Sequence, residues 1–472
     1  MLKDYDKLYI NGEWRASSGT ETIEVVNPAT TEVVGRVPSA TTFDADAAVE
    51  AAHAAFPAWS AQPVEARREV LEALARGIAA REEEIARTVT QEVGTPIERS
   101  RPWQAAQASF VTAGYAELLS RYSFDEEMGN SRIVREAIGP AVCIAPWNFP
   151  LHQAILKVVP ALAAGCTVVL KPSSLSPLNA FLLAEIIDTL GLAPGVFNLI
   201  SGSGSVVGER LVAHPDVAMV SLTGSTEAGR RVAALGAQMI KRVTLELGGK
   251  SAVIICDDAD FDTAVRNGVH NAYANAGQTC AAWTRMLVPR SRLREAEEIA
   301  TDVAEGYLLG DPMDEATTMG PLISASQRDQ VRSFIRVGVD EGAKLLTGGL
   351  DAAVPSVGFY VAPTVFSEVR RDMEISQSEI FGPVLSILPF DSDDDAVAIA
   401  NDSIYGLHGG VWSADVERAT GIARAMRTGR VDINGADFNY AAPFGGYKQS
   451  GLGREFGVFG LEEFLEVKAI SV

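Results

Sequence analysis

Short apolar runs alternate with amphipathic stretches along most of the chain, and this alternation is the pattern of an α/β protein. After Ile138, four runs of β-forming residues are each followed by a stretch with helical spacing of its apolar residues. The runs are "AVCIA", "CTVVL", "VFNLI" and "VAMVSLT", and the helical stretches cover residues 151–164, 177–190, 206–213 and 227–235. Strand, crossover helix and strand repeated in this way predict a parallel, doubly wound sheet with ligands at the carboxyl ends of its strands.

The same pattern begins again at "SAVIICDDADFDTAVRNGV" and continues through "TRMLVP", "GAKLLTGG" and "PVLSILPF". It predicts a second sheet and a domain boundary near Gly248. Ahead of the first sheet, residues 7–38 alternate β-forming residues with turn signals, which predicts hairpins. One helix is then predicted over residues 43–56 and a second over residues 63–94, from a proline start to a glycine stop.

Length and charge narrow the class of protein. A chain of 472 residues is too long for a single hydrophobic core, and 47% hydrophobic with 21% charged residues is an ordinary globular composition. The formal net charge of −21 argues against nucleic acid or an anionic membrane as a partner. Any anionic cofactor must therefore be held by backbone N–H groups and a few cations. The first residues, "MLKDYDKLYI", are acidic where a signal peptide is basic, so we expect a cytoplasmic protein.

The four cysteines lie far apart without a C-x-x-C pair, which predicts neither a disulfide framework nor a metal site. Cys143, Cys166 and Cys256 stand in apolar runs, where a small buried hydrophobe is the expected role. Cys280 differs because it follows glycine, glutamine and threonine in "ANAGQTCAAW", among small residues. This setting leaves open space around one thiol.

Two glycine-rich loops are candidate phosphate sites. "SGSGSVVGE" follows a predicted strand, but its glycine spacing is one residue too long for the G-x-G-x-x-G fingerprint, so a plain turn is as good an interpretation. "SLTGSTEAGR" is better placed, because Gly224 and Ser225 end a strand and open a helix whose free N–H groups can bind pyrophosphate. The alternative is a helix cap with no ligand.

Six motifs occur in order: "APWNFP", "VVLKPSSLSP", "LELGGKSAVI", "AGQTCAAWTR", "SEIFGPVLSI" and "APFGGYKQSGLGRE". Together they closely resemble the NAD(P)-dependent aldehyde dehydrogenase superfamily of the hydrolytic, non-acylating type, over essentially the full chain. The resemblance implies two doubly wound parallel-sheet domains and a small β oligomerisation element. It places a dinucleotide-binding domain at residues 1–120 and 141–247, a catalytic domain at 248–450, and the oligomerisation element at 121–140 and 455–472.

The resemblance implies roles for three residues in aldehyde oxidation. Cys280 matches the nucleophile, whose thiol needs activation because an unshifted thiol is mostly protonated at neutral pH. Asn148 in "PWNFP" matches the side-chain donor of the oxyanion hole, although an asparagine beside a proline also suits a simple turn. Glu246 in "LELGG" matches the base that activates the hydrolytic water, and its flanking leucines favour a raised pKa.

Cofactor contacts carry over in the same way. Lys171 is expected at the adenosine ribose, Gly224 and Ser225 at the pyrophosphate, and Glu379 with Phe381 at the nicotinamide ribose. NAD-preferring relatives often have glutamate three residues after the lysine, where this chain has Ser174. Without that charge, NAD and NADP are both admissible cofactors.

The substrate is expected to be an apolar aliphatic or aromatic aldehyde without a distal carboxylate. By resemblance, its tunnel is lined by Phe149, Gln153, Leu156 and Phe438, which are mostly apolar. Trp283 is either pocket wall or core, with core the commoner role, and aromatic residues between 103 and 115 are candidates for the entrance.

An apolar alternation near the carboxyl terminus predicts a homodimer or homotetramer, because Phe464, Val467, Ile470 and Val472 would leave an exposed edge in a monomer. Two alternative functions remain open. One is a CoA-acylating semialdehyde dehydrogenase, which the presence of Glu246 disfavours. The other is a catalytically idle relative that serves as a binding or structural protein.

Overall fold

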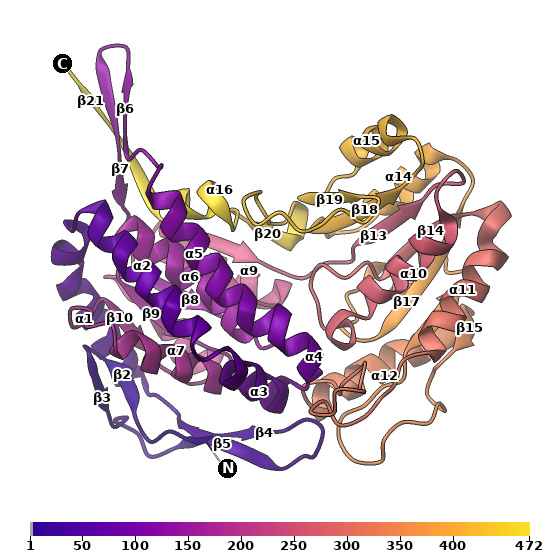
Figure 1. The fold of residues 1–472 in the computed structure, drawn as a ribbon, viewed down its shortest axis with the longest axis horizontal. Coiled ribbons are helices and arrows are strands. Elements are labelled where there is room, and N and C mark those ends of the chain that lie inside the picture. Colours follow the sequence, from indigo (N-terminus) through magenta and orange to yellow (C-terminus); the bar gives the residue numbers. More distant parts are fainter. Residues whose placement is uncertain (1–2) are drawn as a thin grey trace.

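A mixed eight-stranded sheet forms the core of the first half of the protein, which we describe from a computed structural model covering residues 3–472 (Figure 1). Five central strands are parallel. They are β8 (Ala141–Ile144), β9 (Val168–Lys171), β10 (Phe197–Leu199), β11 (Met219–Thr223) and β12 (Arg242–Glu246). The edge strands β2 (Leu8–Ile10), β3 (Glu13–Arg15) and β20 (Gly451–Leu452) run antiparallel. The predicted α/β fold is confirmed, with antiparallel edges that the crossover pattern did not indicate.

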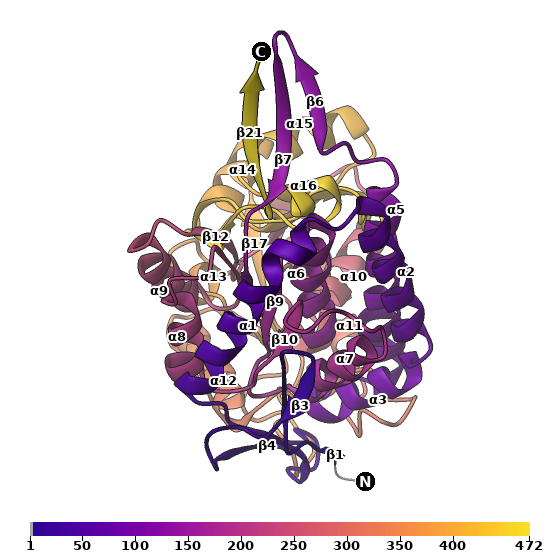
Figure 2. The same ribbon diagram turned by 90° about the vertical axis from the view of Figure 1, so that its left-hand side faces the viewer.

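Helices cover both faces of this sheet (Figures 1 and 2). One face packs against α6 (Pro150–Ala164) and α7 (Leu178–Asp188), with α2 (Val64–Ala79), α3 (Glu82–Val93), α4 (Ile97–Ser100) and α5 (Gln107–Leu119) outside them. The other face packs against α1 (Thr42–Ser60), α8 (Glu209–Val212) and α9 (Thr226–Ala237). Successive side chains of a strand point to opposite faces of the sheet, so neighbouring residues enter different apolar cores. Cys143 and Leu170 belong to the core on one face, and Val142 and Val169 belong to the core on the other.

The helix predicted over residues 63–94 is wrong in one respect, because it is two helices. α2 ends at Ala79, and Arg81 leaves the helical region with φ −119° and ψ 16°. α3 then begins with three consecutive glutamates, and acidic residues stabilise the first turn of a helix through its dipole. The predicted stop is confirmed, since Gly94 adopts φ 86° at the end of α3.

The predicted hairpins at the amino terminus are present. β2 and β3 are joined by Asn11 and Gly12, both with positive φ, which suits the twist of a two-residue turn. A second hairpin consists of β4 (Thr22–Val26) and β5 (Val33–Pro38), and β1 (Lys3–Asp4) joins β5 in a three-stranded sheet.

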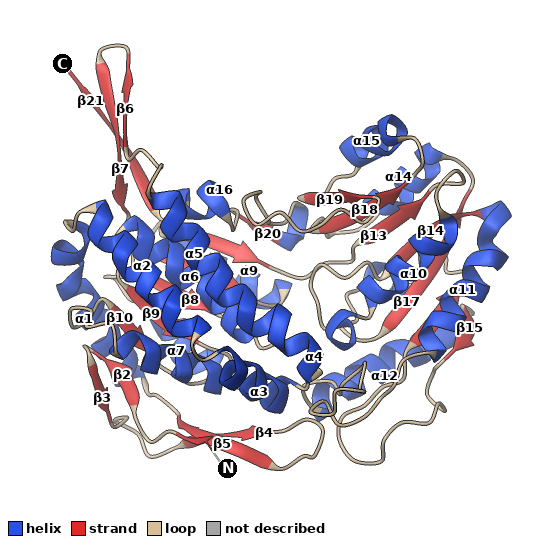
Figure 3. Cartoon of the chain, viewed as in Figure 1, coloured by secondary structure: helices blue, strands red, loops and turns tan. Residues whose placement is uncertain are grey.

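The second sheet has seven strands, of which only the edge strand β15 is antiparallel to its neighbour. Its order is β15 (Lys344–Thr347), β16 (Thr364–Ser367), β17 (Val384–Phe390), β14 (Arg285–Pro289), β13 (Ala252–Ile255), β18 (His408–Trp412) and β19 (Arg430–Ile433). The helices that accompany it are α10 (Phe261–Ala272), α11 (Leu293–Glu305), α12 (Ala325–Asp340), α13 (Glu374–Gln377), α14 (Asp393–Asn401) and α15 (Val416–Ala425) (Figure 3).

A three-stranded arm projects from the first half of the protein (Figures 1 and 2). It consists of β6 (Asp125–Met128), β7 (Ser131–Ala137) and the terminal strand β21 (Leu465–Ser471), which follows α16 (Gly457–Glu462). Val467, Ile470 and Val472 are exposed, as predicted. Phe464 is instead buried in the core at the base of the arm.

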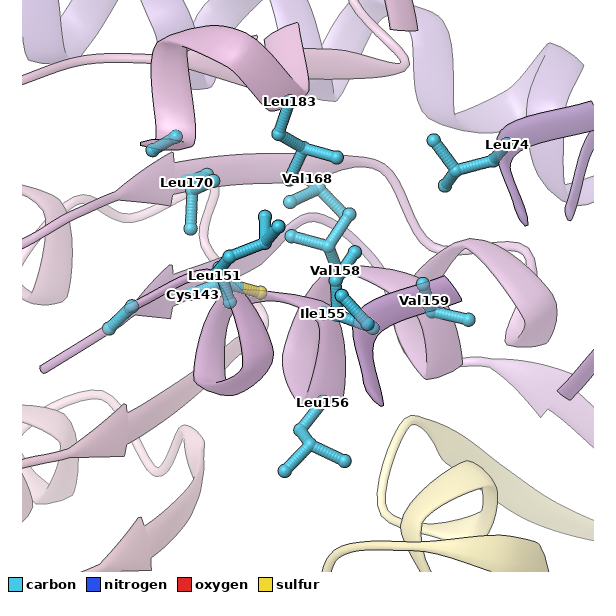
Figure 4. Packing of buried hydrophobic residues seen from close by; sticks show 14 of the residues in the cluster. Leu74, Cys143, Leu151, Ile155, Leu156, Val158, Val159, Val168, Leu170 and Leu183 are labelled. Carbon is cyan, nitrogen blue, oxygen red and sulfur yellow. The ribbon is translucent and has the colours of Figure 1, made fainter. Parts of the chain in front are cut away.

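The core between α6 and the first sheet is tightly filled (Figure 4). Leu151, Ile155 and Val158 of α6 gather with Cys143 and Val168 of the strands. Cys143, Cys166 and Cys256 are all fully buried, as the sequence predicted. Within residues 3–472, no helix combines the length and the apolar character needed to cross a membrane.

Candidate active site

The loop that carries Cys280 begins with three successive residues in the left-handed region, Asn275 (φ 53°), Ala276 (φ 56°) and Gly277 (φ 73°). Left-handed backbone is costly for residues with a Cβ, so surrounding contacts must impose it. At Gly277 the reason is steric, because a Cβ there would lie 2.0 Å from the carbonyl oxygen of Gly382. The backbone before Cys280 is thus in close contact with the loop of Gly382.

Side-chain hydrogen bonds fix this loop from three directions. The Thr95 hydroxyl donates to Asn275 Oδ1 at 2.6 Å, and the Ile323 N–H donates to Gln278 Oε1 at 2.9 Å. Asn148 Nδ2 donates to the carbonyl oxygen of Gln278 at 2.9 Å, two residues before Cys280. The other amide hydrogen of Asn148 makes no hydrogen bond within residues 3–472. Asn148 is therefore held against the loop that carries Cys280 with one N–H available, as an oxyanion donor requires.

Cys280 itself is half-buried. Burial raises the pKa of its thiol, and the carboxylates of Glu246, Glu379 and Glu455 raise it further, while the Ala281 N–H acts in the opposite direction. The thiol is therefore protonated at neutral pH, and a base must remove its proton before it can act as a nucleophile.

Glu246 ends β12 and is buried, and neither of its carboxylate oxygens has a hydrogen-bond partner among the described residues. Burial raises its pKa well above the ordinary value, and the charge of Glu455 adds to the effect. This is the raised pKa that the flanking leucines favoured. Space around the carboxylate depends on glycine, because a Cβ on Gly445 would lie 2.9 Å from Glu246 Oε1.

A buried ion pair lies behind Glu246. Lys157 Nζ is 2.6 Å from Glu455 Oε1 and donates to the Thr223 hydroxyl, also at 2.6 Å. Thr223 in turn donates to Gln153 Oε1 at 3.2 Å. Sequence reasoning missed this pair. A lone lysine in the apolar helix "ILKVVPALAA" was the available signal, because a buried cation needs an anionic partner.

A second buried group missed from the sequence is His408, at the start of β18. Its Nε2 lies 2.9 Å from Asp432 Oδ2, and its Nδ1 lies 3.0 Å from the Ala281 carbonyl oxygen and 3.2 Å from Trp283 Nε1. The indole N–H only donates and the carbonyl only accepts, so Nδ1 bonds one of them at a time, according to its protonation. Trp283 is 2% exposed, which confirms that it belongs to the core.

The predicted cofactor residues lie near the carboxyl ends of the strands in the first sheet and in the facing loops. Lys171 ends β9, is buried without an acidic partner in the described chain, and has its pKa lowered by burial to about 8. The Ser174 hydroxyl donates to the Gly202 carbonyl oxygen at 3.0 Å. Ser225 caps α9 by accepting from the Ala228 N–H, and Gly224 precedes it. The first N–H groups of α9 are thus directed at the same edge of the sheet.

Glu379 and Phe381 face this edge from the second half of the chain. Burial raises the pKa of Glu379 to about 7, and its Oε1 accepts from the Gly249 N–H at 2.9 Å. A Cβ on Gly248 would lie 2.0 Å from Glu379 Oε2. Phe381 adopts φ 56°, and its ring packs edge-on against Trp147 at 5.2 Å. These groups together suit a dinucleotide. They are the buried Glu379 carboxylate, the strained Phe381, Lys171 with no acidic partner among residues 3–472, and the free N–H groups at the start of α9.

The four predicted substrate residues fall into two groups. Phe149 and Gln153 are half-buried at the start of α6, whereas Leu156 is 2% exposed and points away from the other labelled residues of the helix (Figure 4). Phe438 is 37% exposed and stacks under the Arg430 guanidinium at 3.9 Å. A cleft of about 780 Å³ is lined by Trp103, Asn275 and Ala276 among others, and by none of these four residues.

The fold and the site define the class: an α/β oxidoreductase with a thiol and a buried carboxylate at the carboxyl ends of a doubly wound sheet. The chain belongs to the aldehyde dehydrogenase family, whose sequence profile matches residues 14–470. It is 49% identical over 473 residues to 3-succinoylsemialdehyde-pyridine dehydrogenase of a Pseudomonas species, covering 99% of both chains.

Solved structures agree with this assignment. Aldehyde dehydrogenase C of Pseudomonas syringae, as a mutant in complex with NAD⁺ and octanal, is 48% identical with a TM-score of 0.97, covering 99% of this chain and 96% of that one. An aldehyde dehydrogenase of Mycobacterium tuberculosis in complex with NAD⁺ is 41% identical with a TM-score of 0.98, covering 100% and 99%.

Proposed function

We propose that this protein oxidises an aldehyde to the carboxylic acid with NAD or NADP, through a thioester on Cys280. The observation that carries the proposal is the grouping of three residues far apart in sequence: the Cys280 thiol, the free amide hydrogen of Asn148 and the unpartnered carboxylate of Glu246. Each has the chemistry that one step of the reaction needs. The NAD⁺ complexes of two similar enzymes support the choice of cofactor.

In the first step, the thiol proton passes to a water molecule and on to solvent, and the sulfur bonds to the aldehyde carbon. The carbonyl oxygen becomes an oxyanion, stabilised by the Asn148 amide and the Cys280 backbone N–H. The nicotinamide cofactor, when bound, accepts the hydride that the former aldehyde carbon loses. That loss converts the adduct into a thioester on Cys280.

Hydrolysis completes the reaction. Glu246 takes a proton from a water molecule, and the water oxygen attacks the thioester carbon. The carbon–sulfur bond then breaks, and the acid leaves. The sulfur takes the proton that Glu246 accepted from water, so that Cys280 and Glu246 both return to their starting states. Lys157 and Glu455 lie behind Glu246, where their charges bias its protonation.

The cofactor would be held by Lys171 at the adenosine ribose, Gly224 and Ser225 at the pyrophosphate, and Glu379 and Phe381 at the nicotinamide ribose. Ser174 places no carboxylate near Lys171, so a 2′-phosphate meets a cation rather than a repelling charge. We therefore propose that both NAD and NADP are used.

The substrate is proposed to be an apolar aliphatic or aromatic aldehyde. Phe149, Leu156 and Phe438 support an apolar tunnel, and Gln153 adds a polar amide near its inner end. The octanal complex of the Pseudomonas syringae enzyme is consistent with an aliphatic chain.

Assembly and location complete the proposal. The first sheet with residues 1–120 and 141–247 would bind the cofactor, and residues 248–450 would carry the nucleophile. The arm at 121–140 and 455–472 would join subunits of a homodimer or homotetramer, because Val467 and Ile470 are 66% and 46% exposed on it. Four free cysteines support a reducing, cytoplasmic location.

The test of this function is to mix the protein with an aldehyde and either cofactor, without CoA, and to follow the absorbance of the reduced cofactor. Steady reduction with one acid formed per hydride is the expected result. The ratio of the rates with NAD and NADP measures the cofactor preference of a site that has Ser174 in place of a glutamate. Binding of cofactor without any reduction, across aldehydes of different length and aromaticity, would contradict the proposal.

Replacing Asn148 with alanine should lower kcat by about 100-fold or more, because one donor to the oxyanion is lost. The matched control is Gln104→Met, which removes a 3.0 Å hydrogen bond to the Asn148 carbonyl but leaves its amide in place. Steady-state kinetics and urea unfolding of both variants separate the two roles. If Asn148 served only the turn, the two variants would lose activity equally, in proportion to lost stability.

A further inference from the structure

An apolar chamber of about 280 Å³ lies between the second half of α5 and the start of α16. Its apolar lining includes Val111, Leu118, Tyr440, Phe456 and Val458, and Phe110, which is 60% exposed, lies at its rim. Glu117 and Arg121 line it as well, and they pair with each other at 3.8 Å with both side chains largely exposed. An apolar cavity of about 150 Å³ is enough to bind benzene in another protein, so this chamber has room for a larger group.

Two walls of the chamber pack against the predicted substrate residue Phe438. The Phe438 ring lies 4.7 Å from the Tyr440 ring and 5.3 Å from the Phe456 ring. Phe456 directly follows Glu455, the carboxylate that bonds Lys157 and raises the pKa of Cys280. The chamber therefore adjoins Phe438, a residue of the proposed tunnel.

One helical face connects the chamber with the nucleophile loop. Trp103, in the π-helical turn η1 (Arg101–Ala106), lines the large cleft that also contains Asn275 and Ala276. Gln107, Phe110 and Gly114 follow it at helical spacing, and so lie on the same face. Tyr440 is held against this face, because Gln107 Nε2 donates to its hydroxyl at 2.8 Å and the Phe110 ring lies 5.2 Å away.

We propose that this chamber binds the apolar tail of the aldehyde, so that the enzyme favours aldehydes with a long alkyl chain or a terminal ring over short ones. The inference rests on the proposed function. The aldehyde group lies at Cys280, the chain passes Phe438, and its end is buried between α5 and α16. The charged pair at Glu117 and Arg121 leaves the interior without an uncompensated charge, so a tail that ends in a carboxylate is disfavoured.

Gly114 gives a direct test. It lines the chamber on α5, and a Cβ added there would meet no atom within 4 Å. Gly114→Leu therefore fills chamber space without a steric clash at its first atom, and it improves helix propensity. Gly421 is the matched control, since it also lies in a helix, α15, with no atom within 4 Å of an added Cβ, outside the lining of the chamber.

The measurement is kcat/KM with NAD for propanal and octanal in wild type, Gly114→Leu and Gly421→Leu. Wild type should prefer octanal, and Gly114→Leu should lose about tenfold or more for octanal with propanal nearly unchanged, since one misplaced methylene in an apolar pocket has an effect of that size. Gly421→Leu should leave both values unchanged. Val458→Phe, which narrows the chamber from α16, should repeat the selective loss.

Three results would overturn the inference. The first is an equal loss of kcat/KM for both aldehydes in Gly114→Leu. The second is full octanal activity in both folded variants, Gly114→Leu and Val458→Phe, and the third is no preference of the wild type for octanal. Absence of hydride transfer from both aldehydes in wild type is a different failure, because it would count against the proposed function itself.

Discussion

Replacing Cys280 with alanine is expected to abolish aldehyde oxidation while leaving cofactor binding intact. Cys143, Cys166 and Cys256 are fully buried, so no other thiol can take its place. The expected fall in kcat is on the order of 10⁶-fold, the size found when the nucleophile of a serine protease is removed. Absorbance of the reduced cofactor measures the loss, and titration of the variant with NAD measures binding.

The control for this variant is Cys256→Ala. It removes a buried thiol next to the second sheet and should cost stability rather than catalysis. Substantial hydride transfer in Cys280→Ala would show that the aldehyde is oxidised without a thioester, and the mechanism proposed above would fall.

Replacing Glu246 with glutamine should separate the two halves of the reaction. A glutamine amide is not a base, so hydrolysis of the thioester should slow about 10²- to 10⁴-fold, the usual contribution of a general base. Hydride transfer precedes hydrolysis, and we expect one burst of reduced cofactor per active site followed by slow turnover. Rapid-mixing absorbance measures the burst and the steady rate in one trace.

Glu92→Gln is the matched control, because Glu92 is also completely buried and burial raises its pKa to about 7. Its carboxylate accepts from the Leu178 N–H at the start of α7, away from the thiol, so its loss should change stability and not the ratio of burst to turnover. A Glu246→Gln enzyme with normal turnover would remove the glutamate from the mechanism. Turnover that requires CoA in wild type would instead favour acyl transfer to CoA.

The pH dependence follows from the same carboxylate. Glu246 acts as a base only when ionised, and burial with the nearby Glu455 charge raises its pKa well above the ordinary value. The deacylation rate in wild type should therefore rise with pH through that raised pKa, rather than near pH ~4–5 where an exposed glutamate titrates. This rise with pH should be absent from the residual deacylation rate of Glu246→Gln.

The order of strands and crossover helices could be read from the sequence because each crossover element buries one apolar face, which leaves a periodic signal. Asn148, Glu246 and Cys280 could be proposed as site residues from the sequence, since each stands in a short, distinctive motif. What the sequence did not indicate depends on pairs that form only after folding. Lys157 finds Glu455 across 298 positions, and His408 meets Asp432 on the neighbouring strand.

Backbone strain was equally hidden. Asn275 and Ala276 adopt left-handed conformations, which are costly for alanine, and contacts with Thr95, Asn148 and Gln278 hold Asn275 there. The break between α2 and α3 was missed for a related reason. Apolar spacing continues across Ala80 and Arg81, so periodicity alone reads the two helices as one.

The Lys157–Glu455 pair also constrains how the chain is made. A ribosome adds roughly 5–20 residues per second, so Lys157 leaves it roughly 15–60 s before Glu455 exists. During that interval the first sheet has a cation on α6 with no anion to bury it against, and β7 waits for β21 in the same way. The buried ion pair beside Glu246 and the three-stranded arm are therefore completed only when the last part of the chain is synthesised.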